Sequence, residues 1–79
     1  MKEFDLDKYD EDMRFQIRLQ ISLIKLAVDL QKLSSDPSKY NEYVAKRIAV
    51  IRNIIGYDGE FSIRFRGSII FPLTDGIDG

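Results

Sequence analysis

The sequence predicts an α+β fold that is mainly α, in which two long antiparallel helices precede a C-terminal β-hairpin. Three patterns lead to this prediction. Polar residues follow one helical stripe over residues 10–33, an Asp-Pro pair opens a second helical pattern over residues 37–55, and apolar residues alternate with polar ones within residues 60–72. A chain of 79 residues has room for one modest core, so residues 1–79 are expected to form a single domain.

The first helix is expected over residues 10–33 because its polar residues recur three and four positions apart. This spacing places them on one side of a helix and leaves apolar faces on both flanks. The polar stripe contains Arg14, Arg18, Ser22, Lys25, Asp29 and Lys32. One apolar face contains Met13, Ile17, Ile21, Ile24 and Val28, and the other contains Phe15, Leu19, Leu23, Leu26, Leu30 and Leu33. Asp7 or Asp10 can cap the start of the helix.

The beginning of the same segment also fits an extended strand. Residues 13–21 alternate apolar and polar side chains without exception, which indicates a strand when this stretch is taken alone. One helix explains all of residues 10–33 by a single rule, whereas a strand explains nine residues and requires a helix after it. The helix is therefore the preferred interpretation, and the strand stays open as the alternative.

The second helix is expected over residues 37–55. Asp36 and Pro37 are typical of a helix N-cap followed by proline at the first helical position. Gly56 is well placed to end the helix in a left-handed conformation. Only Ser34 and Ser35 lie between the first helix and Asp36, the expected N-cap of the second, so the helices are expected to run antiparallel.

Strand character follows a turn at residues 57–60. Phe61, Ile63 and Phe65 alternate with polar residues, Gly67 interrupts the pattern, and residues 68–71 form a second apolar run before a proline. This pattern predicts a hairpin over about residues 60–72, with its register open. The acidic N-terminal leader, residues 1–9, and the C-terminal tail, residues 74–79, are expected to be poorly ordered.

The predicted helices carry more apolar surface than one chain covers. The first would be about 36 Å long and apolar around most of its circumference. Packing the helices of two chains into a four-helix bundle would bury the surplus, so a homodimer or higher homo-oligomer is expected. The expected oligomer interface consists of Phe15, Gln16, Leu19, Gln20, Leu23, Leu26 and Leu30.

No catalytic motif occurs in the sequence. The chain contains no cysteine and no histidine, which removes thiolate metal ligands, the commonest imidazole ligand and the commonest general base. Glycine-rich phosphate loops and the GxSxG elbow are also missing. A calcium loop starting at Asp5 fails, because Tyr9 stands at its third ligand position and Asp10 stands where glycine is needed. No enzyme, metal site or cofactor is therefore expected.

Cationic side chains are the remaining candidates for a ligand or partner site. The candidate residues are Arg14, Arg18, Lys25, Arg64, Arg66 and Tyr9. If Arg64 and Arg66 met the arginines of the first helix, they would form a cationic patch able to hold phosphate, with the tyrosine available for stacking. The alternative is that all of these residues belong to ordinary solvated faces.

Taken as a strand, residues 13–19 followed by two helices resemble the ribbon-helix-helix repressors. In that family, two chains pair their N-terminal strands into a ribbon that enters the major groove of DNA. The resemblance covers about residues 13–56, including Tyr40–Val44 as the start of the second helix, and it implies that Arg14, Gln16 and Arg18 read base edges. Asp36 departs from this pattern, since it would place a negative charge where phosphate should sit, and six acidic residues precede the ribbon.

The sequence thus predicts a non-enzymatic, oligomeric binding or regulatory protein that acts by occupying a protein or a small anionic, nucleotide-like partner. A DNA-binding repressor is the alternative. In size and type the chain resembles the accessory proteins of phages and mobile elements. Because the N-terminus has no signal-peptide pattern and no apolar run reaches 18 residues, a cytoplasmic location without a membrane partner is expected.

Overall fold

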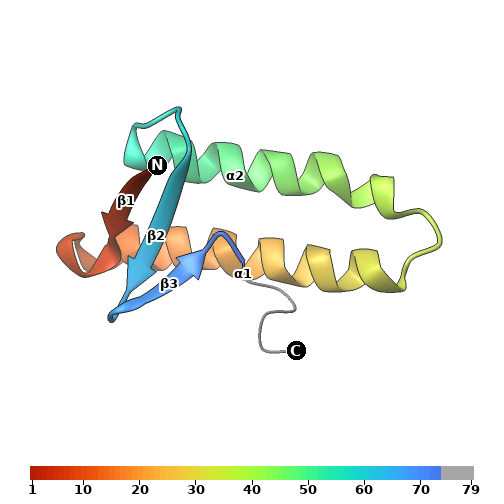
Figure 1. Cartoon of the computed structure of the whole chain (residues 1–79), viewed down its shortest axis with the longest axis horizontal. Helices are drawn as coiled ribbons and strands as arrows, with labels where there is room; N and C mark the ends of the chain where they lie inside the picture. Colours follow the sequence, from red (N-terminus) through yellow and green to blue (C-terminus); the bar gives the residue numbers. More distant parts are fainter. Residues whose placement is uncertain (74–79) are drawn as a thin grey trace.

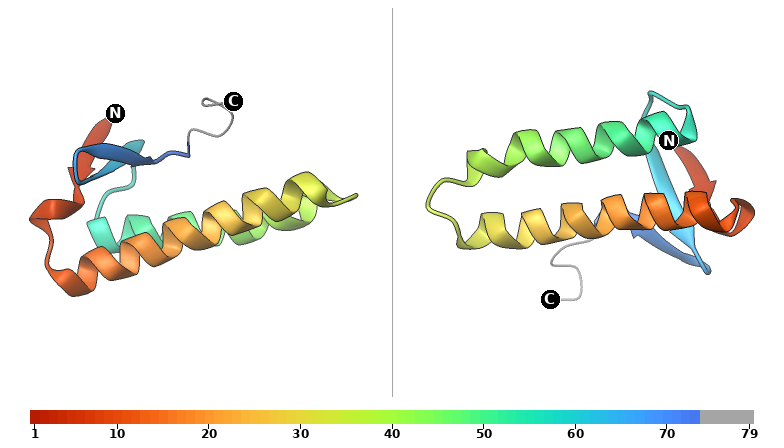
Figure 2. Two further views of the ribbon diagram at one scale, coloured as in Figure 1. Left: turned by 90° about the horizontal axis from the view of Figure 1, so that it is seen from below. Right: turned by 180° about the vertical axis from the view of Figure 1, so that it is seen from behind.

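Two antiparallel helices, α1 (Glu11–Leu33) and α2 (Asn41–Ile55), form one layer, and a three-stranded sheet lies across one end of it (Figure 1). The computed structural model describes residues 1–73. The sheet has the order β1 (Lys2–Asp5), β2 (Phe61–Phe65) and β3 (Ser68–Phe71), with β1 parallel and β3 antiparallel to β2. The sheet covers only one side of the helix layer, near the start of α1 and the end of α2 (Figure 2). The predicted mainly helical α+β class is confirmed.

Helix α1 begins where its capping residue ends the preceding extended segment. The carboxylate of Asp10 accepts a hydrogen bond of 2.8 Å from the backbone N–H of Met13, which satisfies one of the unpaired donors at the helix start. Residues 13–21 all lie within this helix, so the strand interpretation of that stretch is wrong. The ribbon on which the resemblance to ribbon-helix-helix repressors depended is a helix in this chain.

The helical period decides which apolar residues of α1 enter the core. Ile17, Ile21 and Ile24 follow one another at helical spacing and are buried, whereas Phe15 and Leu19 are exposed. A strand would instead have buried Phe15, Ile17 and Leu19 together. Only one of the two apolar faces of α1, the one that contains Ile17, therefore packs in the core.

Helix α2 is preceded by a short 3₁₀ helix, η2 (Pro37–Tyr40), so the predicted segment 37–55 is helical with a tighter first turn. Gly56 ends α2 with φ +68°, and its N–H donates to the carbonyl of Arg52. This left-handed end is the conformation expected for the glycine. Within the described residues, neither helix is long and apolar enough to cross a membrane.

The N-terminal segment belongs to the fold, contrary to the expectation of a poorly ordered leader. β1 pairs with β2, and a 3₁₀ helix, η1 (Leu6–Lys8), follows it. The side chain of Leu6 is fully buried in the core. The predicted hairpin is therefore part of a three-stranded sheet. The expectation for the tail, residues 74–79, lies outside the described residues.

The turn between β2 and β3 consists of Arg66 and Gly67, both with positive φ, at 52° and 81°. A two-residue hairpin turn of this kind matches the twist of the flanking strands. Strand alternation turns Ile63 and Phe65 toward the helices and Arg64 toward the outer face of the sheet. The turn thus places Arg66 on the side of the sheet that faces α1, whereas β2 places Arg64 on the opposite side.

The core lies where the sheet covers the helices. Its four largest fully buried side chains come from four different elements, namely Leu6, Ile17, Ile51 and Ile63. Aromatic rings extend it along the sheet, with Phe61 stacked on Phe71 at 5.5 Å between centroids. Among residues 1–73, no second layer covers the part of the helix pair beyond the sheet (Figure 2).

Candidate functional site

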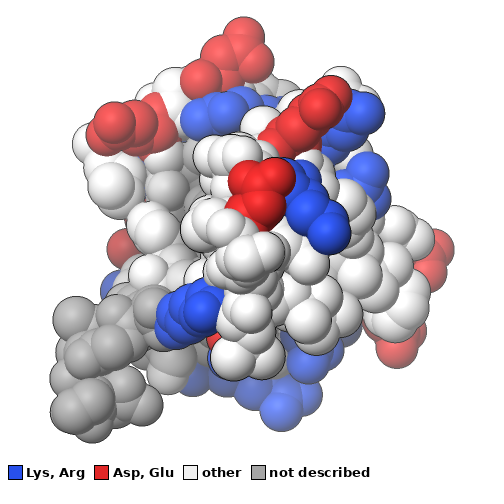
Figure 3. Space-filling view, turned by 90° about the vertical axis from the view of Figure 1, so that its right-hand side faces the viewer, with Lys and Arg blue, Asp and Glu red and all other residues white. Residues whose placement is uncertain are grey.

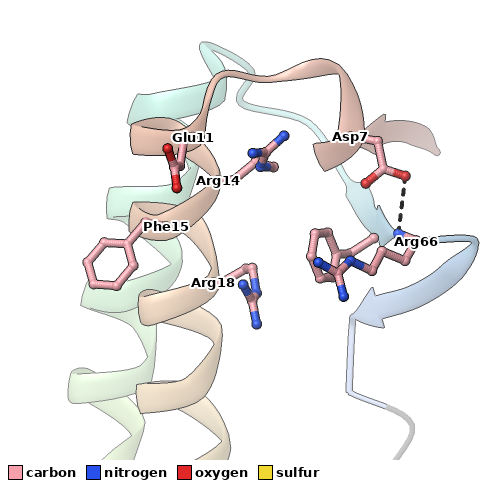
Figure 4. A pocket seen from close by; sticks show the side chains of 7 residues that line it. Asp7, Glu11, Arg14, Phe15, Arg18 and Arg66 are labelled. Atoms are coloured by element: carbon pink, nitrogen blue, oxygen red, sulfur yellow. Dashed lines mark hydrogen bonds between the residues drawn. The ribbon is translucent and has the colours of Figure 1, made fainter.

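A pocket of about 310 Å³ lies between the start of α1 and the β2–β3 turn (Figure 4). Three arginines line it, Arg14 and Arg18 from α1 and Arg66 from the turn. We call it the arginine pocket. Its three guanidinium groups extend into the space between the helix and the sheet (Figure 4).

Phe65 forms the platform of the arginine pocket. The guanidinium carbon of Arg18 lies 4.5 Å from the centre of its ring, and that of Arg66 lies 4.9 Å from the same point. Such cation–π contacts hold a guanidinium group in place while its N–H donors stay available. Two positive charges from elements far apart in the sequence thus share one aromatic ring.

Backbone contacts fix the remaining walls of the pocket. Arg14 donates through Nη1 to the carbonyl of Tyr9 at 3.3 Å. The carboxylate of Asp7 accepts a hydrogen bond of 3.2 Å from the backbone N–H of Arg66 (Figure 4), which ties the turn to η1. Glu11 adds a second carboxylate to the lining.

The arginine pocket carries an excess of positive charge. Its three arginines face two carboxylates, and within residues 1–73 none of the three forms an ion pair. Guanidinium groups bind phosphate and carboxylate through paired N–H donors. Chemically, the pocket is therefore suited to holding an anionic group.

Arg64, which the sequence placed in the same cationic patch, lies elsewhere. Its Nε donates to Glu3 Oε2 at 2.7 Å and its Nη2 to Glu3 Oε1 at 3.4 Å, while its Nη1 donates to the carbonyl of Gly67 at 2.8 Å. The reason is strand alternation, which turns Arg64 to the opposite face from Phe65. Arg64 therefore stabilises the junction of β1 and β2.

The pair of Glu3 and Arg64 makes the stability of the sheet depend on pH. The hydrogen bond from Arg64 lowers the pKa of the Glu3 carboxyl. A carboxyl whose pKa is lowered by folding stabilises the fold above its ordinary pKa, and this stabilisation is lost as the pH falls through the folded value. We expect the urea concentration at the midpoint of unfolding to decrease as the pH is lowered below about 5. This decrease should be smaller in Glu3→Gln. The exposed Glu60 provides the control, since Glu60→Gln should leave the pH dependence unchanged.

Two other predicted binding residues also lie outside the arginine pocket. Lys25 forms an exposed pair with Asp29 at 3.6 Å, one helical turn along α1. The ring of Tyr9 packs against the core, and only its carbonyl reaches the arginines. Of the six predicted residues, the structure brings together Arg14, Arg18 and Arg66.

Most residues of the predicted oligomer interface lie on the exposed side of α1. Leu26 is 56% exposed, and Phe15, Gln16, Leu19 and Leu30 are exposed as well. Leu23 is half-buried. Leu33, at 85% exposed, continues the same line although it was not assigned to the interface. Leu26 is opposite the buried Ile17, because nine residues rotate a helix by about two and a half turns. We call Leu19, Leu23, Leu26, Leu30 and Leu33 the leucine stripe.

Gln20 does not belong to this exposed surface. It is 6% exposed, and its Oε1 accepts a hydrogen bond of 3.1 Å from Nη1 of Arg47 on α2. The guanidinium group of Arg47 lies 5.3 Å from the ring centre of Tyr43. The predicted interface role of Gln20 is thus replaced by a contact between the two helices of one chain.

Charge is mixed on the end of the molecule that carries the connection between the helices (Figure 3). Acidic and basic side chains are interspersed there, some next to each other and others separated by uncharged surface (Figure 3). Among residues 1–73, no group of three acidic side chains is placed to hold a metal ion. The arginine pocket is therefore the best candidate for a ligand-binding site among the described residues.

Three pocket residues, Asp7, Glu11 and Phe65, were not predicted as site residues. For Phe65 the signal was present, because its alternation with Arg64 places it on the helix side of the strand. No sequence pattern indicated that Asp7 and Glu11 would line the pocket, since their position depends on how η1 folds. The chain matches no protein-family model, no curated protein and no solved structure.

Proposed function

We propose that this chain is a non-enzymatic binding protein that works as a homo-oligomer and acts by occupying an anionic partner. The observation that carries the proposal is the leucine stripe, an apolar seam on a helix whose opposite face already fills the core of its own chain. The arginine pocket lies beside this helix and offers the binding site.

The spacing of the leucine stripe supports pairing with another helix. Its residues follow one another at intervals of four, three, four and three, which is the spacing of the a and d positions in a coiled coil. Leucines at these positions insert as knobs between the side chains of a facing helix. A seam of this kind is complementary to an identical seam.

A second copy of the chain is the occupant that fits. The stripe holds no charged side chain, so two copies would meet without repulsion between like charges. Its leucines together with Phe15 expose apolar area on the order of 500 Å². Two copies would bury at most about 1,000 Å² in this way, which is at the lower limit for a specific interface. The sheet covers one side of the helix layer (Figure 2), and Leu26 lies on the face of α1 opposite Ile17, which is buried in the core under the sheet.

We expect the wild-type chain to run as a dimer or larger assembly in light scattering. Leu26→Glu should weaken the association by at least about tenfold, because it places a carboxylate in an apolar seam. Its helical circular dichroism should be retained, since Leu26 is largely exposed in the single chain. Ala49→Glu, an equally charged change at an exposed position of α2, is the matched control and should leave the mass unchanged.

A wild-type chain that stays monomeric at high micromolar concentration would contradict the proposed assembly. Equal masses for Leu26→Glu and the wild-type oligomer would show that the association uses another surface.

A further inference from the structure

We propose that the arginine pocket binds the phosphoryl group of a small phosphomonoester that also carries hydroxyl groups. This inference rests on the proposed binding function and names its ligand class. The pocket is built from residues of one chain, and none of them belongs to the leucine stripe, although Phe15, which also lines the pocket, lies next to that stripe.

The arrangement of the three arginines points to an anion. Arg18 and Arg66 hold their guanidinium groups 4.5 Å and 4.9 Å from the centre of one phenylalanine ring, although like charges at close range repel each other. Arg14 is fixed beside them by the carbonyl of Tyr9. Within residues 1–73 no ion pair neutralises these groups. A bound dianion would relieve the repulsion and use the free N–H donors.

Phosphate matches this donor set better than a carboxylate does. A phosphomonoester presents three acceptor oxygens in a tetrahedral arrangement, whereas a carboxylate presents two in a plane. Three guanidinium groups approaching from a helix and a turn can each pair with a different edge of the tetrahedron. The exposed positions of Arg18 and Arg66 leave their donors accessible from solvent.

The size of the pocket and its two carboxylates further restrict the class of ligand that it can bind. A volume of about 310 Å³ is at the small end for ligand sites, which suits a phosphoryl group with a small attached moiety. Asp7 and Glu11 would repel a second anionic group, but they accept hydrogen bonds from hydroxyl groups. Sugar phosphates and nucleoside monophosphates share these features.

The test is calorimetric titration of the full chain at low salt with ribose 5-phosphate, adenosine monophosphate, inorganic phosphate and unphosphorylated ribose. We expect the two phosphomonoesters to bind at one site per chain and ribose not to bind. Arg18→Ala and Arg66→Ala should each weaken binding by about tenfold or more. Lys25→Ala removes one exposed positive charge from the same helix and should leave binding unchanged.

Glu11→Gln separates the phosphoryl part of the proposal from the hydroxyl part. It should tighten binding of inorganic phosphate, because it removes a repelling charge. It should tighten ribose 5-phosphate less, because an amide oxygen accepts a hydrogen bond from a hydroxyl group more weakly than a carboxylate does. If no phosphorylated probe binds, or if Lys25→Ala weakens binding as much as Arg18→Ala, the proposal is overturned. Leu26→Glu should bind ribose 5-phosphate as the wild type does, so a failure of self-association is distinguishable from a failure of this site.

Discussion

Replacing Leu6 with alanine is expected to lower the free energy of unfolding by about 2–5 kcal/mol, the usual cost of truncating a fully buried leucine. Leu6 is 0% exposed and packs within the core that α1, α2 and β2 share. A chain of this size has a stability of only about 5–10 kcal/mol. The loss should therefore remove a large share of the stability of the chain.

Urea denaturation followed by circular dichroism measures this loss directly. Lys8→Ala is the matched control, because Lys8 is exposed in the same 3₁₀ helix and its truncation removes no core contact. We expect the control to change stability by less than about 0.5 kcal/mol. A Leu6→Ala variant as stable as Lys8→Ala would show that the N-terminal segment does not belong to the core.

Truncating Arg47 to alanine is expected to cost about 1–3 kcal/mol, because it leaves the buried Oε1 of Gln20 without its donor. The change also removes the stacking of the guanidinium group on Tyr43. The two helices would then lose one of their polar contacts and keep the hydrogen bond from Gln31 to Asn41. Chemical denaturation at a fixed low protein concentration measures the cost without a contribution from self-association.

A double-mutant cycle tests whether the cost comes from the unpaired amide. Gln20→Leu combined with Arg47→Met replaces both partners with apolar groups and should be nearly neutral, since no buried polar group is left unpaired. The Nε of Arg47 is already buried without a partner among the described residues, so the wild-type pair is itself imperfect. Additive losses in the double variant would show that Gln20 and Arg47 do not act as a pair.

Gln20 illustrates why part of the candidate site was misplaced. The helical period places Gln20 between the two apolar faces of α1, and this side of the helix can face either α2 or a second chain. The choice depends on where α2 lies, and Arg47 on α2 provides the donor. Exposure of Leu26 and Leu30 follows from the same geometry, because burying Ile17 and Ile24 turns the leucines outward.

The amino-acid sequence by itself determined the boundaries of α1, the left-handed end of α2 at Gly56 and the pairing of β2 with β3, because caps, helical period and short turns act between residues close in the chain. It did not determine the start of α2, where a 3₁₀ turn precedes Asn41 and the side chain of Asp36 makes no cap hydrogen bond. Only the tertiary structure decided that Lys2–Asp5 would pair with Phe61–Phe65, at a separation of about sixty residues. That pairing buries Leu6 and turns Arg64 toward Glu3, and the turn that follows brings Arg66 to Arg14 and Arg18. Contacts of this kind depend on how distant segments pack together, which local patterns do not specify.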